Sequence, residues 1–167
     1  ISIDRLMEDG LLPAGITSLA PVETSEADFA AAQAYKWPLF ERAFRKLFAD
    51  VQHAALRAEF GEFAERERAW LDDYALFMAI KEAQGLRPWT EWPQPLRDRQ
   101  PSALTDIKQR LSLRMDLHRF VQWQFERQWH ALRKAATELG IELIGDVPIF
   151  VAHDSVEVWC DRSQFLL

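Results

Sequence analysis

The chain has 167 residues, and its 20 basic and 26 acidic side chains leave a formal net charge of −6. Because nucleic acids and anionic lipids attract basic surfaces, this charge argues against either of them as a partner. The sequence contains no apolar run near the roughly 18 residues that a membrane span requires. The single cysteine, Cys160, allows no intrachain disulfide and is typical of a reducing compartment, so we expect a cytoplasmic protein.

The rest of the composition gives no sign of a metal or a cofactor. The 4 histidines are scattered along the chain without metal-ligand spacing, and the sequence has no glycine-rich phosphate loop and no internal repeat. The length suits one domain. Because the chain begins with Ile1 and not with Met, we expect it to be a segment of a longer protein.

Helical spacing of apolar residues dominates the first half of the chain. Residues 1–10 form a predicted short helix that Gly10 ends, and a loop rich in proline and glycine follows over residues 11–22. The helical pattern resumes over residues 25–48, where Pro38 removes a backbone donor and is a potential kink.

Two more helices and a loop precede the middle of the chain. We predict a short helix over residues 56–63 and a strong helix over residues 66–83, whose apolar stripe includes Lys81. Residues 87–101 are rich in proline and form a predicted ordered loop, because their two tryptophans would be costly to leave exposed. These tryptophans are Trp89 and Trp92.

The longest predicted element is one helix over about residues 103–139, in which apolar residues recur at spacings of three and four. At ~1.5 Å per residue it would be roughly 55 Å long. Such a helix must pack along several others, so we expect it to be the spine of the helical part. We place Trp129 in the core, on one stripe with Phe125 and Leu132.

A change of pattern follows this helix. Gly140 is a typical helix stop, and the apolar run over residues 141–146 has the length of a buried strand. Pro148 should end regular pairing. A helix, a tight turn and a strand make half of a βα unit, in which functional groups follow the carboxyl end of the strand. Asp146 stands there. The alternative is a turn aspartate that accepts hydrogen bonds from nearby backbone N–H groups.

The last predicted element is a short helix that begins near Asp154. Asp154 is a good N-cap residue, and Glu157 three positions later completes a capping box. Trp159 falls at the end of this helix, either in the core or lining a cleft. The predicted fold class is therefore mainly α, with one long spine helix followed by one short strand. A parallel strand needs neighbours on both sides, and this chain supplies none, so either the chain is part of a larger enzyme or the strand is exposed and reorganised.

Several motifs resemble one enzyme family. Residues 144–151 read IGDVPIFV and residues 154–159 read DSVEVW. Together they resemble the signature of the 4-α-glucanotransferases called amylomaltases or disproportionating enzymes, with Val156 where that family usually has Ala. Segments typical of the same family occur in family order over the rest of the chain: residues 1–12, residues 70–81 and residues 120–129.

The resemblance implies a (β/α)8 barrel with inserted subdomains that acts on α-1,4-glucans with retention. Residues 1–139 would be a helical subdomain, and residues 140–167 would be the third barrel strand with its following loop and short helix. The catalytic nucleophile, the acid/base and the stabilising carboxylate of the family lie on later strands, so we expect no catalytic residue here. The resemblance makes the maltooligosaccharide substrate and the remainder of the barrel the expected partners. It also suggests that Asp146 lies near the donor glucose site, and it makes four residues candidates for substrate binding: Asp146, Asp154, Ser155 and Trp159.

Two interpretations remain open for other polar and aromatic residues. Trp89 and Trp92 could stack on a sugar ring, but tryptophans that fasten a loop to neighbouring helices are more common. The glutamines Gln122, Gln124 and Gln128 could reach sugar hydroxyls, but bonding across helix faces is the more common role. The alternative function for the whole chain is a helical interaction module without chemistry. The downstream carboxylates that retaining transfer needs would distinguish the two.

Overall fold

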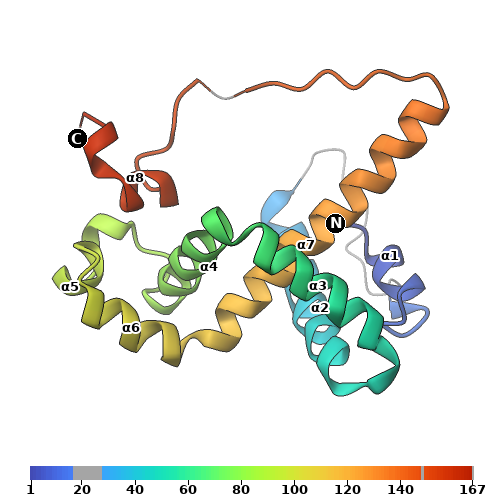
Figure 1. The fold of residues 1–167 in the computed structure, drawn as a ribbon, viewed down its shortest axis with the longest axis horizontal. Helices are drawn as coiled ribbons and strands as arrows, with labels where there is room; N and C mark the ends of the chain where they lie inside the picture. Colours follow the sequence, from blue (N-terminus) through green and yellow to red (C-terminus); the bar gives the residue numbers. More distant parts are fainter. Residues whose placement is uncertain (17–27, 148, 167) are drawn as a thin grey trace. The chain divides into compact units, whose positions relative to one another are not determined.

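The computed structural model describes residues 1–16, 28–147 and 149–166, and these residues are mainly helical (Figure 1). None of the described residues belongs to a β-strand, and none of their helices is long and apolar enough to cross a membrane. The chain divides into two compact units. The first unit combines Ile1–Glu65 with Phe120–Leu139, and the second combines Arg66–Arg119 with Gly140–Leu167.

The first unit contains the helices predicted near the amino terminus. Helix α1 spans Ile3–Glu8, α2 spans Phe29–Ala49 and α3 spans Ala54–Arg66, with a short 3-10 turn, η2, over Val51–His53. Gly10 follows α1 with a φ of +72°, a conformation that glycine adopts without steric cost. The predicted loop over residues 11–22 and the predicted helix start near Ser25 fall partly or wholly outside the described residues.

Helix α2 continues through Pro38, which is exposed. Its first turn is closed by Asp28, whose side chain accepts a hydrogen bond from the Ala31 backbone N–H at 2.8 Å. This cap satisfies one of the N–H groups that a helix start leaves without a partner. The helix therefore begins at Phe29 with a capped first turn.

Aromatic rings from α2, α3 and the later part of α7 form the core of the first unit. Helix α7 spans Ser112–Glu138, and its Phe120 and Trp123 are almost completely buried. The Trp123 ring lies 5.5 Å from that of Phe60, and the Phe120 ring lies 5.7 Å from that of Phe44. Such buried rings provide most of the apolar area that stabilises a helical unit of this size.

The second unit is built around helix α4, Arg68–Ala83, which matches the predicted strong helix. Phe77 of α4, Trp92 and Trp159 have ring centroids 5.3 to 5.8 Å apart and are nearly fully buried. Trp89 is also buried, so both loop tryptophans fasten this segment to the helices. The other elements of this unit are η3 over Trp89–Glu91, α5 over Gln94–Arg97, α6 over Pro101–Arg110, the start of α7, α8 over Val156–Cys160 and η4 over Arg162–Gln164.

The single long helix predicted over residues 103–139 is wrong in one respect, because α6 and α7 are separate helices. The break lies at Leu111, whose φ of −107° and ψ of 13° leave the helical range. The Leu111 N–H still donates to the Ile107 carbonyl at 2.9 Å. Apolar residues at 107, 111 and 115 keep a spacing of four across the break, so the periodic pattern does not reveal it.

The predicted core position of Trp129 is also wrong for this chain. Trp129 is 40% exposed, and Phe125, which stacks on it at 6.4 Å, is 53% exposed. The buried face of this part of α7 instead carries Phe120, Trp123 and Gln124. Aromatic residues lie on two faces of this helix, and helical spacing alone does not determine which face is turned towards its neighbours.

The strand predicted over residues 141–146 does not form in the described residues. Residues 141–147 have no regular secondary structure and are all exposed, with Ile144 at 98%. A strand is stabilised by hydrogen bonds to an adjacent strand, and the described part of the chain offers no such neighbour. Pro148, expected to end regular pairing, lies outside the described residues.

Candidate functional site

Asp146 lies in the exposed extended segment that follows Gly140. Within the described part of the chain, no hydrogen bond or ion pair reaches its carboxylate. The turn-aspartate interpretation requires backbone N–H donors close to this side chain, and here the described residues provide none. The side chain is therefore free to meet groups from outside this chain.

Asp154, eight residues further along, has quite different surroundings. Its carboxylate forms an ion pair with Lys81 of α4, and its Oδ1 accepts a hydrogen bond from the Trp89 backbone N–H at 3.2 Å. The Lys81 side chain is 18% exposed and that of Asp154 is 33% exposed, so water screens the pair only partly. The prediction that Asp154 caps the following helix is wrong, because these partners take up its carboxylate.

Ser155 is the residue that caps helix α8. Its side-chain oxygen accepts a hydrogen bond from the Val158 backbone N–H at 3.5 Å. Both Asp154 and Ser155 are residue types that favour helix starts. Ser155 caps α8 because the Asp154 side chain already contacts Lys81 and Trp89. These tertiary contacts cannot be read from the sequence.

The backbone next to Asp154 is held by Trp89. The Trp89 indole N–H donates to the His153 backbone carbonyl at 2.7 Å. The Trp89 and His153 ring centroids lie 5.6 Å apart, with an interplanar angle of 31°. The guanidinium of Arg162 covers the Trp89 ring at 4.5 Å, a cation–π distance. Trp89 thus binds the start of the α8 segment through its backbone, its indole N–H and its ring.

Trp159 is buried, not exposed at the edge of a cleft. It is 1% exposed, and its indole N–H donates to the Leu96 carbonyl at 3.1 Å. Arg99 lies over its ring at 4.2 Å and also pairs with Asp73 at 2.8 Å. These contacts anchor α8 in the second unit and leave no face of the indole open to a ligand.

Cys160 is not a nucleophile in this setting. Burial raises the pKa of its thiol to about 12, although the guanidinium of Arg99 opposes this shift. The thiol therefore stays protonated near neutral pH, where only a thiolate reacts efficiently.

Sequence reasoning did not predict the contact between Lys81 and Asp154. In the sequence, Lys81 is one position of an apolar helical stripe and the last residue of the family-like segment over residues 70–81. A lysine is rarely buried unless it is paired. A cation in an apolar stripe was therefore a signal that a carboxylate from another part of the chain approaches it.

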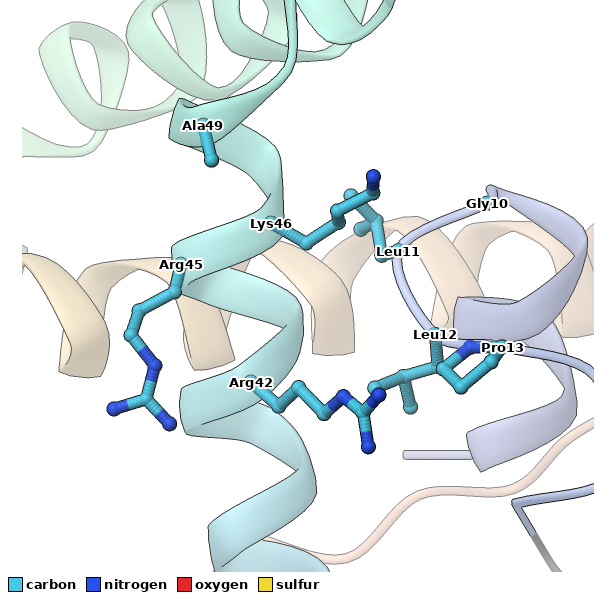
Figure 2. Close-up of a pocket in the computed structure, with 8 residues that line it drawn as sticks. All are labelled: Gly10, Leu11, Leu12, Pro13, Arg42, Arg45, Lys46 and Ala49. Carbon is cyan, nitrogen blue, oxygen red and sulfur yellow. The ribbon is translucent and has the colours of Figure 1, made fainter.

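The pocket shown in Figure 2 lies in the first unit, between α2 and the turn after α1. Its volume is about 460 Å³. Arg42 and Lys46 extend from α2 towards the turn, whereas Arg45 points to the other side of the helix in this view (Figure 2). The lining residues are Gly10, Leu11, Leu12, Pro13, Arg42, Arg45, Lys46 and Ala49. They include no carboxylate, whereas retaining glycosyl transfer needs two carboxyl groups about 5–5.5 Å apart.

A second, smaller pocket of about 200 Å³ does contain carboxylates. Arg127 pairs with Asp9 at 2.5 Å and with Glu59 at 3.0 Å, and Arg5 pairs with Glu8 at 2.7 Å. The two Arg127 pairs join α7 to α3 and to the end of α1, so Asp9 and Glu59 serve the packing of the first unit, whereas Arg5–Glu8 is an exposed pair within α1. In the described part of the chain, no group of three His, Cys, Asp or Glu side chains could hold a metal ion.

Comparison with known proteins identifies the group to which this architecture belongs. A family model described as 4-alpha-glucanotransferase matches residues 1–167. A 4-alpha-glucanotransferase from Thermus thermophilus is 49% identical over 140 residues, which are 84% of this chain and 28% of that protein. One from Synechocystis sp. is 39% identical over 168 residues, covering 100% of this chain and 33% of that protein.

The fold agrees with a solved structure. An amylomaltase from Streptococcus agalactiae, in complex with acarbose, superposes with a TM-score of 0.90 at 30% sequence identity. The match covers 100% of this chain and 34% of the amylomaltase chain, so this chain spans about a third of the relatives it matches. Because the family model covers the whole sequence, the chain belongs to the 4-alpha-glucanotransferase family.

Proposed function

We propose that this chain is a segment of an enzyme that transfers α-1,4-glucan segments between maltooligosaccharides by a retaining double displacement. The observation that carries the proposal is the family match over residues 1–167. The acarbose complex of the Streptococcus agalactiae amylomaltase supports a carbohydrate substrate for the whole protein. The nucleophile, the acid/base and the stabilising carboxylate would come from parts of the protein outside this sequence.

In the whole protein, residues 1–139 would form a helical subdomain, and residues 140–167 would supply the third strand of a (β/α)8 barrel with its following loop and short helix. The exposed apolar side chains of residues 141–147 support this assignment. A strand between two parallel neighbours buries such side chains on both faces. In the chain by itself, residues 141–147 are exposed, whereas Asp154 pairs with Lys81 and Trp159 is buried in the second unit.

Asp146 would contribute directly to binding the donor glucan or to orienting the carboxylates around it. Its carboxylate is exposed and without a partner in the described residues, and it would follow the carboxyl end of a barrel strand, where such enzymes bind substrate. Asp154, Ser155 and Trp159 were predicted to bind substrate too. Their present contacts favour a supporting role behind the loop that carries Asp146.

The partners of this segment would be the glucan and the remainder of the barrel. A reducing compartment such as the cytoplasm fits the single cysteine. The alternative, a helical interaction module, predicts that the whole protein has no glycosyl transfer activity.

The test is transfer from maltotriose by the full-length protein and by the isolated 167-residue chain. We expect the full-length protein to release glucose and to form longer maltooligosaccharides. The isolated chain should form neither, because the family's catalytic carboxylates are absent from it. If the isolated chain released glucose, and replacing one of its own carboxylates abolished this release, the proposal that the catalytic carboxylates lie outside this chain would be refuted. A full-length protein without transfer would favour the interaction module.

A further inference from the structure

We propose that Lys81 and Asp154 form a clamp that positions the loop carrying Asp146, and that both are positioning residues for glucan transfer. The inference rests on the proposed function for its catalytic consequence. Its structural part rests on contacts within the second unit alone.

The Lys81–Asp154 pair lies between an exposed segment of the chain and the anchored helix α8. Residues 141–147 and 149–153 are exposed, and among the described residues after Gly140 the first hydrogen bond to the rest of the unit is made by the His153 carbonyl and the first ion pair by Asp154. Helix α8, which follows Asp154, is anchored in the unit by Val158 and Trp159, each 1% exposed. The ion pair therefore lies where the free loop returns to the packed unit.

The side of the clamp that Lys81 provides is rigid. Lys81 lies in the last turn of α4, next to Ile80, which is fully buried, and its ammonium lies 5.7 Å from the centre of the Phe77 ring. A lysine held at a buried helix face loses less conformational freedom on pairing than a lysine at the surface. The pair thus fixes Asp154 relative to the core of the second unit.

Asp154 makes two different contacts with the two oxygens of one carboxylate. One oxygen meets the Lys81 ammonium and the other accepts the Trp89 backbone N–H. The ammonium requires the negative charge, whereas the N–H requires only an acceptor. Replacing Asp154 by Asn therefore removes the charge pairing and retains the hydrogen bond from Trp89, which separates the two contributions.

Fixing the downstream end of a loop limits where Asp146 can lie. Eight residues separate Asp146 from Asp154, a span of at most roughly 26–29 Å at about 3.3–3.6 Å per residue. If the clamp opens, the end of the loop moves and Asp146 samples more positions. Misplacement of a catalytic-site group by about 1 Å can cost on the order of a hundredfold in rate.

The experiment is a double-mutant cycle in the full-length enzyme, combining Lys81→Met with Asp146→Asn. We expect Lys81→Met to lower kcat/KM at least fivefold. In the Asp146→Asn background it should lower kcat/KM by less than twofold, because the charge at position 146 that the clamp would position is then absent. Lys81→Arg, which keeps the charge, should retain activity within threefold of the parent. Effects of Lys81→Met that are equal in both backgrounds would overturn the proposal.

A matched control and a readout independent of activity complete the design. Lys134 forms an exposed pair with Glu138 at 3.9 Å, with 78% and 65% of the two side chains exposed, so Lys134→Met should leave kcat/KM within twofold. In Lys81→Met, hydrogen exchange at the Trp89 backbone N–H should become at least tenfold faster than in the parent. In Asp154→Asn, the increase in this exchange rate should be smaller. Unchanged exchange at Trp89 in Lys81→Met would refute the clamp, even if the parent enzyme shows no transfer and the proposed function fails.

Discussion

Asp146 and Asp154 show how far the surroundings of a residue decide its role. Both are aspartates that follow apolar runs and are plausible turn or cap residues from sequence. In the structure, Asp154 is engaged by Lys81 and Trp89, while Asp146 meets no partner among the described residues. A charge without a partner near an expected strand end is a stronger indication of substrate contact than a paired one.

Replacement of Asp146 by Asn keeps its shape and most of its hydrogen-bonding capacity but removes its charge. In the full-length enzyme we expect kcat/KM to fall at least about tenfold, roughly 1.4 kcal/mol of transition-state stabilisation. The melting temperature should hardly change, because no contact within this chain is lost. Activity within twofold of the parent would show that the charge has no role. A large loss of stability would instead show that Asp146 is a structural turn residue.

Trp123 and Trp129 are a matched pair of tryptophans on one helix. Trp123 is 1% exposed and Trp129 is 40% exposed. Emptying a buried aromatic site typically costs about 3–5 kcal/mol, so Trp123→Ala should destabilise the isolated chain by that amount. Trp129→Ala should cost about 1 kcal/mol or less. Urea unfolding of the two variants measures the difference, and equal losses would show that both faces of α7 are packed.

Among the elements, α4 and α7 are joined by a cluster of charges within the second unit. Glu82 of α4 pairs with Arg114 and lies 3.3 Å from His118, which is 2% exposed. Burial raises the pKa of Glu82, but its close contacts with His118 and Arg114 outweigh this and hold the pKa below its usual value of 4.5. Ionised Glu82 therefore stabilises the contact between these helices.

The pH dependence of this contact has a definite sign. Because the pKa of Glu82 is lower in the folded state, its stabilisation is complete above about pH 4.5 and is lost as the pH falls through the folded-state value. We expect the melting temperature of the parent to fall more steeply below pH 4.5 than that of Glu82→Gln. Parallel melting curves for the two proteins across this range would contradict the role given to Glu82.

The extent of each element was predictable where a local signal marks its end. Gly10, Gly85 and Gly140 all have φ near +70° and follow helices that were expected to end there. The break at Leu111 has no such signal, since the residue is a good helix former and the apolar spacing continues across it. The buried face of α7 was likewise not determined, because residues 120–132 carry aromatic side chains on two sides.

For the molecule as a whole, the family and the helical class could be predicted from the sequence. Both depend on patterns of residues that are close together along the chain: the family motifs and the helical spacing of apolar residues. The strand and the candidate site could not be predicted in the same way. A strand depends on neighbours in space, and the pairing of Lys81 with Asp154 joins residues 73 positions apart. Sequence spacing contains no direct information about such contacts, so the contacts of Asp154, Ser155 and Trp159 became visible only in the structure.

The uncovered segment after Gly140 has a consequence for the isolated chain in solution. Its exposed apolar side chains include Ile144 at 98%, Val147 at 82% and Phe150 at 89%. An extended apolar segment with unpaired backbone groups is a template for self-association through intermolecular β-pairing. We expect the purified segment to aggregate in a concentration-dependent manner with a rising β signal in circular dichroism, and Ile144→Lys to suppress this. Monodisperse sedimentation of the parent at high concentration would show that the segment is protected from aggregation.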